Sequence, residues 1–447
     1  MRMAEGPEGA SLAEEADPSR DEPRSKTGLA AFRYRDYRWM QSARLLSVIA
    51  NEMQSVAVAW QVYEITHRAL DLGYVGLAQF LPGILLALIA GHAADRFDRR
   101  RVLLICNAGY AIASMMLLWQ AAHHIDNVRA ILAIMLVIGT IRAFSGPASQ
   151  ALMPQLVSEA DFPNAVAWSS SIFMTATILG PALGGLIYGF GGTGAFSGAG
   201  ALSGQHSGAT FVYAVAVPMY LLAVVSVALI GTRTGGLEKR AASMETLLAG
   251  FKYVYEQKII LGSISLDLFA VLLGGAVALL PIYADKILHV GPWGLGILRS
   301  APAVGAMIMS VMMAYRPLRK SAGATMLWCV AAFGAATVVF GLSRSFWMSM
   351  IMLFITGAAD MVSVIVRGTL VQIATPAEMR GRVSAVNLLF IGASNEFGEF
   401  ESGLTAQWLG AVRAVVLGGV GTLIVVAVWA WRFPELRKVQ RLEMRSS

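Results

Sequence analysis

Apolar runs of about 20 residues follow one another along most of the chain, separated by short polar or charged connections. A helix of about 20 apolar residues crosses a hydrocarbon core of roughly 30 Å. The pattern therefore predicts an all-α integral membrane protein with twelve transmembrane helices. The predicted spans are residues 40–64, 72–94, 101–121, 130–150, 164–189, 211–231, 259–284, 294–315, 323–342, 346–371, 383–408 and 412–431.

The predicted spans form two sets of six. Short segments of the two sets resemble each other at an offset of about 215–218 residues, such as Ile134–Arg142 and Ile351–Asp360. Equivalent halves of this kind build many secondary transporters. We expect a disordered cytoplasmic tail at 1–31, a six-helix bundle at 32–231, a cytoplasmic linker at 232–258, a second six-helix bundle at 259–432 and a cytoplasmic tail at 433–447.

The composition supports a membrane protein. Hydrophobic residues make up 56% of the chain and charged residues 14%, and the mean hydropathy is +0.60. An ordinary soluble domain carries roughly 25% charged residues, so soluble domains, a disordered protein and a secreted disulfide scaffold are excluded. Cys106 and Cys329 lie far apart in apolar stretches, so we expect no disulfide, metal site or cofactor.

The distribution of Lys and Arg predicts the orientation. With the N-terminus in the cytoplasm, 26 of the 35 basic residues fall in connections on that side and five on the other. Basic residues accumulate in cytoplasmic loops of membrane proteins. We therefore expect both termini in the cytoplasm, and the net charge of +7 is explained without nucleic acid as a partner.

The turn between the second and third predicted spans reads GHAADRFDRRRV. It resembles the signature loop of the major facilitator superfamily, G-x-x-x-D-R/K-x-G-R/K-R/K, with Asp98 where that family usually has Gly. A merely basic cytoplasmic loop would explain the arginines but not the acid four residues after a glycine. The resemblance implies a cytoplasmic gate formed by Gly91, Asp95, Arg96, Arg99 and Arg100.

The fifth predicted span contains Gly180, Pro181, Gly184 and Gly185. Proline bends a helix, and glycine lets helix backbones approach closely. On its own this pattern predicts a kinked, tightly packed helix. It also resembles the G-P-x-x-G-G element of proton-coupled exporters in the superfamily, and that resemblance favours efflux over uptake.

Arg142 lies in the fourth predicted span. A guanidinium inside a membrane requires an ionic partner or a water-filled cavity. Its position resembles the fourth-span arginine motif of the superfamily, which is linked there to proton movement. A purely structural ion pair between helices is the alternative.

Carboxyl groups in the spans are the other candidates for proton coupling, which requires an acid that gains and loses a proton between two states. In superfamily architecture, spans one, four, seven and ten line the central cavity, which implies access to it for Glu52, Arg142, Asp267, Asp360 and Arg367. Asp360 and Arg367 are seven residues apart and share a helix face, so a structural ion pair is the alternative for them.

Glu396 and Glu399 share one face of the eleventh predicted span, and Glu401 lies off it. Like charges this close should not all ionise when buried. We expect Glu396 or Glu399 to hold a proton in at least one state. The alternative is a broken, partly hydrated helix whose acids are structural.

The resemblance covers residues 32 to 432, and stretches such as VAVAWQVYEIT resemble the superfamily branch that includes the enterobactin exporter and macrolide efflux proteins. It implies a bacterial inner-membrane secondary transporter, not an enzyme, that exports an amphiphilic drug, siderophore or metabolite in exchange for protons by alternating access. We expect a monomer in the lipid bilayer. A proton-coupled importer of a small metabolite and a non-transporting signalling or scaffold protein are the alternatives.

Overall fold

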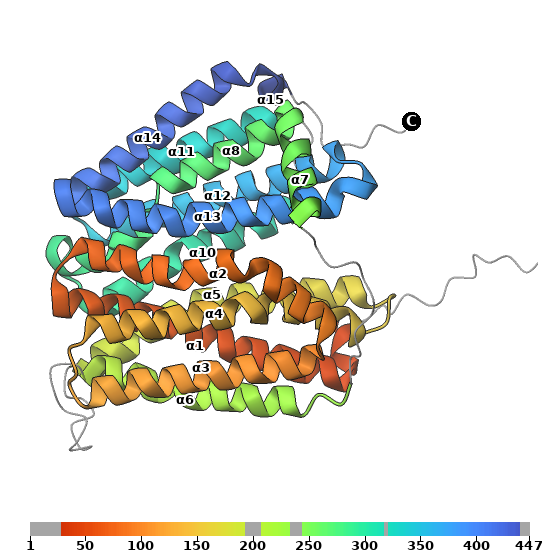
Figure 1. Ribbon diagram of the computed structural model, residues 1–447. Helices are drawn as coiled ribbons and strands as arrows, with labels where there is room; N and C mark the ends of the chain where they lie inside the picture. Colours follow the sequence, from red (N-terminus) through yellow and green to blue (C-terminus); the bar gives the residue numbers. More distant parts are fainter. Residues whose placement is uncertain (1–27, 193–206, 233–243, 317–320, 439–447) are drawn as a thin grey trace, which may run out of the picture.

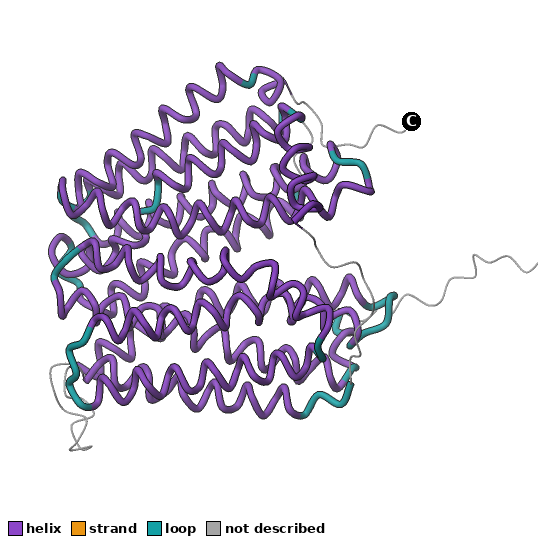
Figure 2. The backbone as a smooth tube through the Cα atoms, viewed as in Figure 1, coloured by secondary structure: helices purple, strands orange, loops and turns teal. Residues whose placement is uncertain are grey.

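The computed structural model describes residues 28–192, 207–232, 244–316 and 321–438, and within these residues every regular element is helical (Figure 2). The elements are η1 (Ala30–Arg33), α1 (Arg35–Thr66), α2 (Ala69–Arg96), α3 (Arg99–Ala122), α4 (Val128–Leu152), η2 (Met153–Gln155), α5 (Phe162–Gly192), α6 (Ser207–Ala228), α7 (Met244–Glu256), α8 (Lys258–Leu273), η4 (Ala276–Leu279), α9 (Leu280–Ile282), η5 (Tyr283–Ile287), α10 (Gly291–Tyr315), α11 (Ala322–Leu342), α12 (Phe346–Ala374), α13 (Ala377–Leu409), α14 (Ala411–Arg432) and α15 (Pro434–Lys438).

Ten helical stretches among the described residues are long and apolar enough to cross a membrane. They are α2 to α6, the stretch Lys258–Ile287 that begins with α8, α10 to α12 and α14. The chain is therefore a multi-pass membrane protein, and the part that the structure describes is all-helical. Helices α1 and α13 are the longest elements, with 32 and 33 residues, but polar side chains lower their hydropathy. These two helices contain Glu52, Glu396 and Glu399, three of the acids expected at the functional site.

The helices pack as two sets, which form the lower and upper parts of Figure 1. In the N-terminal set, α1 packs against α5 and α6, α2 against α4, and α3 against α4 and α6. In the C-terminal set, α10 packs against α12, and α11 against α12 and α14. The sets meet mainly along two seams, α5 with α10 and α2 with α13.

Glycines bring the two sets together at one end of the molecule. A Cβ atom on Gly185 of α5 would lie 2.6 Å from the Cα of Gly296 in α10, and one on Gly403 of α13 would lie 3.0 Å from the Cα of Gly73 in α2. Only glycine permits backbones this close. We call this the closed end. The other end, on the right of Figure 1, carries the α2–α3 turn, α7 and α15, and we call it the basic end.

The buried apolar side chains show the same asymmetry. The largest cluster takes residues from both sets, among them Val62 and Leu298, and joins the sets at the closed end. Nearer the basic end, Tyr37 and Leu152 belong to a cluster within the N-terminal set, whereas Met326 belongs to one within the C-terminal set. The two sets therefore share a core at one end and have separate cores at the other.

Two features differ from the predicted spans. The connection at 232–258 contains the helix α7, because Val254 is buried in a cluster with Ile260 and Val383. The predicted seventh span, 259–284, is interrupted after α8 at Gly274 and Gly275 and continues as short helical turns. There a Cβ on Gly275 would lie 2.6 Å from the carbonyl oxygen of Gly398 in α13, so close packing accompanies the break.

Some predictions fall mostly outside the described residues. The expected disordered tail at 1–31 lies there except for its last four residues, and so do most of the C-terminal tail and the middle of the connection at 232–258. Of the residues in that first tail that the structure describes, Ala31 donates a backbone hydrogen bond to the Asn164 side chain and is fully buried. Ala31 thus packs with the helices although it lies within the predicted tail.

Candidate functional site

A polar cavity of about 170 Å³ lies where the two sets of helices meet, and we call it the seam cavity. The N-terminal set contributes residues from α1, α2 and α4, and the C-terminal set from η4, α10 and α13. Its polar lining consists of Asn51, Glu52, Ser55, Gln79, Arg142, Arg299, Glu396 and Glu399. The cavity therefore concentrates charge at a depth where apolar side chains are the rule.

Helical spacing explains how these side chains reach one place. Glu52 and Ser55 are three residues apart on α1, and Glu396 and Glu399 are three apart on α13, so each pair shares a helix face. Arg142 projects from the middle of α4 and Arg299 from α10. Each set thus brings both an acid and a guanidinium to the cavity.

The charged groups interact across the seam. The Arg299 Nη2 atom donates a hydrogen bond of 2.9 Å to Ser55 Oγ in the other set. Arg142 Nη1 lies 3.5 Å from Glu396 Oε1, again in the other set, and the Arg142 side chain is 58% exposed. That ion pair is long and solvent-accessible, so it adds little to stability. It joins α4 of one set to α13 of the other.

The cavity lining is not electrically balanced. Three carboxyl groups, those of Glu52, Glu396 and Glu399, face two guanidinium groups. With all three acids ionised, the lining is one positive charge short of neutrality. An uncompensated charge at membrane depth is costly, so the site favours the uptake of one proton or one cationic group.

A second cavity adjoins the seam cavity on the side of the basic end. It has a volume of about 240 Å³ and shares Gln79, Arg142 and Glu396 with the seam cavity. Its lining continues to Ile84 on α2 and Leu389 on α13, which lie nearer the basic end. Together with the packed glycines at the closed end, this arrangement gives the charged groups an approach from the basic end.

The remaining predicted coupling residues lie elsewhere. Arg367 of α12 forms an ion pair with Asp267 of α8, and their side chains are 2% and 6% exposed. Asp360 lies two turns before Arg367 on α12. The ion pair of Arg367, however, is with Asp267 and not with Asp360. None of these three residues lines the seam cavity in this conformation. They form a separate charged group within the C-terminal set.

The gating motif lies at the basic end. Asp98 caps α3, and its carboxylate accepts a hydrogen bond of 3.0 Å from the Arg100 N–H. The φ angle of Asp98 is −60°, so this position does not require the glycine of the family pattern. The Arg100 guanidinium donates hydrogen bonds to the carbonyl oxygens of Val227 and Ala228 at the end of α6. Arg96 is exposed and Arg99 buried; the Asp95 side chain lies outside what the structure describes.

The glycine–proline motif of α5 faces the other helices of the site. A Cβ on Gly184 would lie 2.8 Å from the backbone of Met53 in α1, and Gly180 packs against the Glu52 side chain. The Pro181 carbonyl lies beside Gly296 of α10. The motif therefore packs α5 against the helix that carries Glu52 and against the helix that carries Arg299.

Arg299 is the functional candidate that the sequence reasoning did not select. Arg299 lies inside the predicted span 294–315 and is one of four basic residues within predicted spans. A guanidinium in an apolar span is the signal that identified Arg142, so the same reasoning could have selected Arg299. Asn51, Ser55 and Gln79 carry no such signal, because uncharged polar residues are common in membrane helices. Among the described residues, no three His, Cys, Asp or Glu side chains are grouped as ligands for a metal ion.

Comparisons with known proteins agree with this architecture. The profile of the transmembrane secretion effector family matches residues 26–447. The multidrug efflux pump Tap of Mycobacterium tuberculosis (strain ATCC 25618 / H37Rv) is 25% identical over 411 residues, covering 89% of this chain and 93% of Tap. The enterobactin exporter EntS of Escherichia coli O81 (strain ED1a) is 25% identical over 388 residues, covering 86% of this chain and 84% of EntS.

Solved structures share the fold. A bacterial homologue of the human lysosomal transporter Spinster, in an inward-facing and occupied conformation, superposes with a TM-score of 0.71 at 16% identity and covers 90% of this chain and 97% of its own. The nucleoside transporter NupG superposes with a TM-score of 0.63 at 15% identity and covers 90% of this chain and 99% of its own.

Proposed function

Because the chain belongs to the transmembrane secretion effector family of the major facilitator superfamily, and is therefore a membrane transporter, we propose that it exports an amphiphilic organic molecule in exchange for protons. The relatives Tap and EntS are an efflux pump and an exporter, which supports the direction of transport. The charged seam cavity supports coupling to protons. We propose a monomer as the working unit.

We infer that α1 and α13 also cross the membrane, which gives twelve spans in two six-helix bundles, at 32–231 and 259–432. Both helices exceed 30 residues, more than the roughly 20 residues needed to cross a bilayer. Glu52, Glu396 and Glu399 of these helices line the seam cavity, which lowers the cost of placing them in a membrane. The excess of Lys and Arg supports a cytoplasmic location of the basic end and of both termini.

The asymmetry of the seam supports the following transport cycle. The glycine contacts between α5 and α10 and between α2 and α13 seal the closed end, while the second cavity reaches towards the basic end. The conformation is then inward-facing, and rocking of the two bundles would part the glycines and expose the seam cavity to the other side. We assign Gly91, Asp95, Arg96, Arg99 and Arg100 to the gate at the basic end.

One observation carries the coupling proposal, namely the three carboxyl groups and two guanidinium groups that face one another across the seam. A proton on one carboxyl group makes the lining neutral. When the bundles rock, the cross-seam contacts of Arg142 and Arg299 change, and so does the affinity of the acids for that proton. A difference in proton affinity between two access states is what couples proton flow to transport. Substrate and proton then occupy the cavity in turn.

Transport by the purified chain in proteoliposomes tests this proposal. The probes are a catecholate siderophore, a macrolide and a lipophilic cationic dye, each with and without an imposed pH gradient. We expect at least one probe to accumulate against its own gradient only while protons flow the opposite way. Accumulation in the same direction as the protons would instead identify an importer, and no movement of any probe under either gradient would support a non-transporting role.

A matched pair of variants locates the coupling. Glu399→Gln removes an acid of the seam cavity, whereas Glu401→Gln removes an acid two residues away that accepts a hydrogen bond from Thr405 and is not part of the cavity lining. We expect Glu399→Gln to abolish accumulation driven by the pH gradient and Glu401→Gln to preserve it. Equal effects of the two substitutions would refute the assignment.

A further inference from the structure

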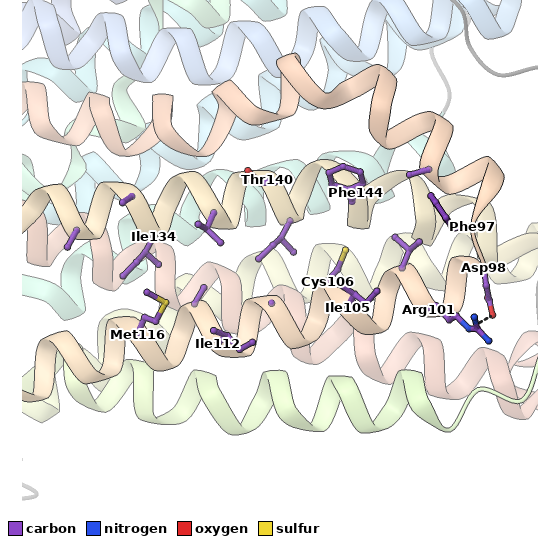
Figure 3. Close-up of a pocket in the computed structure, with 18 residues that line it drawn as sticks. Phe97, Asp98, Arg101, Ile105, Cys106, Ile112, Met116, Ile134, Thr140 and Phe144 are labelled. Carbon is purple, nitrogen blue, oxygen red and sulfur yellow. Dashed lines mark ion pairs between the residues drawn. The ribbon is translucent and has the colours of Figure 1, made fainter.

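A long apolar groove runs along the outer side of α3 and α4, away from the seam cavity (Figure 3). Its volume is about 930 Å³. It extends from Phe97 and Arg101 at the basic end to Met116 of α3 and Ala130 of α4. At a rise of 1.5 Å per residue, the α3 part of the groove is about 22 Å long, which exceeds half the thickness of a hydrocarbon core of roughly 30 Å.

The shape of the groove comes from small residues between large ones. Gly109, Ala113 and Ala133 leave space between the helices, and a Cβ on Gly109 would already lie 2.9 Å from the Ile141 side chain. Large apolar side chains border this space, and Ile105 is 69% exposed. The groove is therefore open to the membrane along its length and matches a linear hydrocarbon chain.

The basic end of the groove is charged. A second hollow of about 400 Å³ adjoins the groove, and both are lined by Asp98, Arg101 and Ile105. Arg100 lines the second hollow but not the groove. The Arg101 side chain is 84% exposed and lies 3.7 Å from the Asp98 carboxylate, a pair that Figure 3 shows at the mouth of the groove. Two guanidinium groups and one carboxylate give this mouth a net charge of +1.

We propose that the groove and the adjoining hollow together bind one anionic phospholipid from the leaflet at the basic end, with an acyl chain in the groove and the phosphate beside Arg101. Guanidinium groups pair with phosphate oxygens in a planar, two-pronged geometry, and basic clusters at a membrane surface recognise anionic headgroups. A phospholipid supplies both the apolar chain and the anion that this lining calls for, whereas an apolar helix of a second protein would fill only the groove. This inference does not depend on the direction or coupling of transport.

Native mass spectrometry of the full-length protein in detergent tests the headgroup. The probes are phosphatidylglycerol and phosphatidylethanolamine with identical acyl chains, added in equal amounts. We expect one phosphatidylglycerol to be retained in preference, and Arg101→Gln to reduce that preference about fivefold, the effect of one basic residue near an anionic surface. The control is Arg316→Gln, an exposed arginine at the end of α10, which should leave the preference unchanged.

A second pair of variants tests the groove. Ala133→Trp places a ring in the groove, whereas Ala427→Trp places one on the exposed side of α14. Of these two variants, we expect only Ala133→Trp to lower lipid retention. If the Trp variant does not fold, Ala133→Leu is a smaller substitution that should also lower retention, though less. Equal retention of the two lipids, or full retention in both Ala133 variants, would overturn the assignment. A dimer that Ala133→Trp dissociates would assign the groove to a second copy of the chain and overturn it as well.

Discussion

Two groups of charged side chains lie at membrane depth, and they differ in which part of the molecule holds them. The seam cavity takes its charges from both sets of helices, and its contacts are loose, with Arg142 and Glu396 at 3.5 Å and the Arg142 side chain 58% exposed. The pair of Asp267 and Arg367 lies within the C-terminal set and is almost completely buried.

We propose that this difference separates charges that serve movement from charges that serve structure. A pair held inside one set keeps its geometry when the sets rock, so its energy is the same in both access states and cannot drive a cycle. Charges shared between the sets change their neighbours during the same motion. We therefore expect substitutions at Arg367 to affect stability first, and substitutions in the seam cavity to affect transport first.

The largest expected effect comes from breaking the buried pair. Arg367→Met leaves the Asp267 carboxylate buried without its partner, which typically costs about 3–5 kcal/mol. The measurement is unfolding in detergent, followed by intrinsic fluorescence. The double variant Asp267→Leu with Arg367→Met removes both charges of the pair and should recover part of the loss, because Asp360 of the same group then remains without a guanidinium nearby. A single variant that keeps its stability and loses only transport would place this pair in the coupling machinery.

Closure of the seam gives the next effect. A methyl group at Gly185 would lie 2.6 Å from the Gly296 backbone, whereas one at Gly189, a turn later on α5, would meet Trp293 at 3.4 Å, an ordinary contact. Overpacking costs about 1–3 kcal/mol, so Gly185→Ala should lower the transport rate about tenfold and Gly189→Ala less than twofold.

Cysteine labelling shows whether opening of the closed end causes the lower transport rate of Gly185→Ala. A cysteine introduced at Ala59, which lines the seam cavity, reports access from that end in a background without the two native cysteines. We expect faster reaction with a water-soluble thiol reagent in the Gly185→Ala variant. If the labelling rates are the same in both glycine variants, the seam is not the barrier.

A smaller change in stability accompanies the loss of a seam charge. Arg142→Gln removes a solvent-accessible ion pair worth less than about 1 kcal/mol, yet it should reduce transport driven by the pH gradient at least tenfold. Transport assays and unfolding measurements on the same preparation give the two numbers. A loss of stability in proportion to the loss of transport would make Arg142 a structural residue, like Arg367.

A last effect, on stability alone, concerns Asp36, a carboxylate outside the membrane spans. Its Oδ2 atom accepts hydrogen bonds from the Thr232 hydroxyl at 2.6 Å and from the N–H groups of Thr232 and Gly231 at 2.8 and 3.0 Å. These bonds connect the start of α1 to the residues that follow α6. Burial opposes ionisation, but these hydrogen bonds outweigh it and lower the pKa of Asp36 below its usual value of 3.8.

A lowered pKa fixes the direction of the pH dependence. The stabilisation by Asp36 is fully present above about pH 4 and is lost as the pH falls through the lower pKa of the folded state. Asp36→Ala should therefore cost about 1 kcal/mol at neutral pH, because exposure to water limits the effect. Unfolding temperatures of wild type and variant should converge in strong acid. A constant difference at all pH values would show that the interaction does not depend on charge.

Much of the fold was predictable because each apolar run carries its own signal. Ten predicted spans coincide with apolar helices, although the seventh is broken after α8. The break at Gly274 and Gly275 and the helix α7 were not predicted. The first accompanies packing of Gly275 against Gly398, and the second depends on burial of Val254 between distant helices. Both are tertiary effects that no local pattern records.

The site was predictable in its residue types but not in its pairing. Charges inside spans identified Glu52, Arg142, Glu396 and Glu399, which the structure brings together. The sequence placed Asp360 and Arg367 on one face of a helix, yet Arg367 pairs with Asp267, 100 residues away. Which partner an arginine meets depends on how neighbouring helices are rotated about their axes, and single-residue spacing within a helix does not contain that information.

Proton release on substrate binding tests the central claim most directly. With a transported probe identified, binding to the purified protein is followed in weakly buffered solution with a pH-sensitive dye. The account predicts release of a proton by the wild type, loss of that release when Glu396 and Glu399 are both replaced by Gln, and normal release from Glu401→Gln. Undiminished release from the double variant would show that the proton is held elsewhere and would contradict the assignment of coupling to the seam cavity.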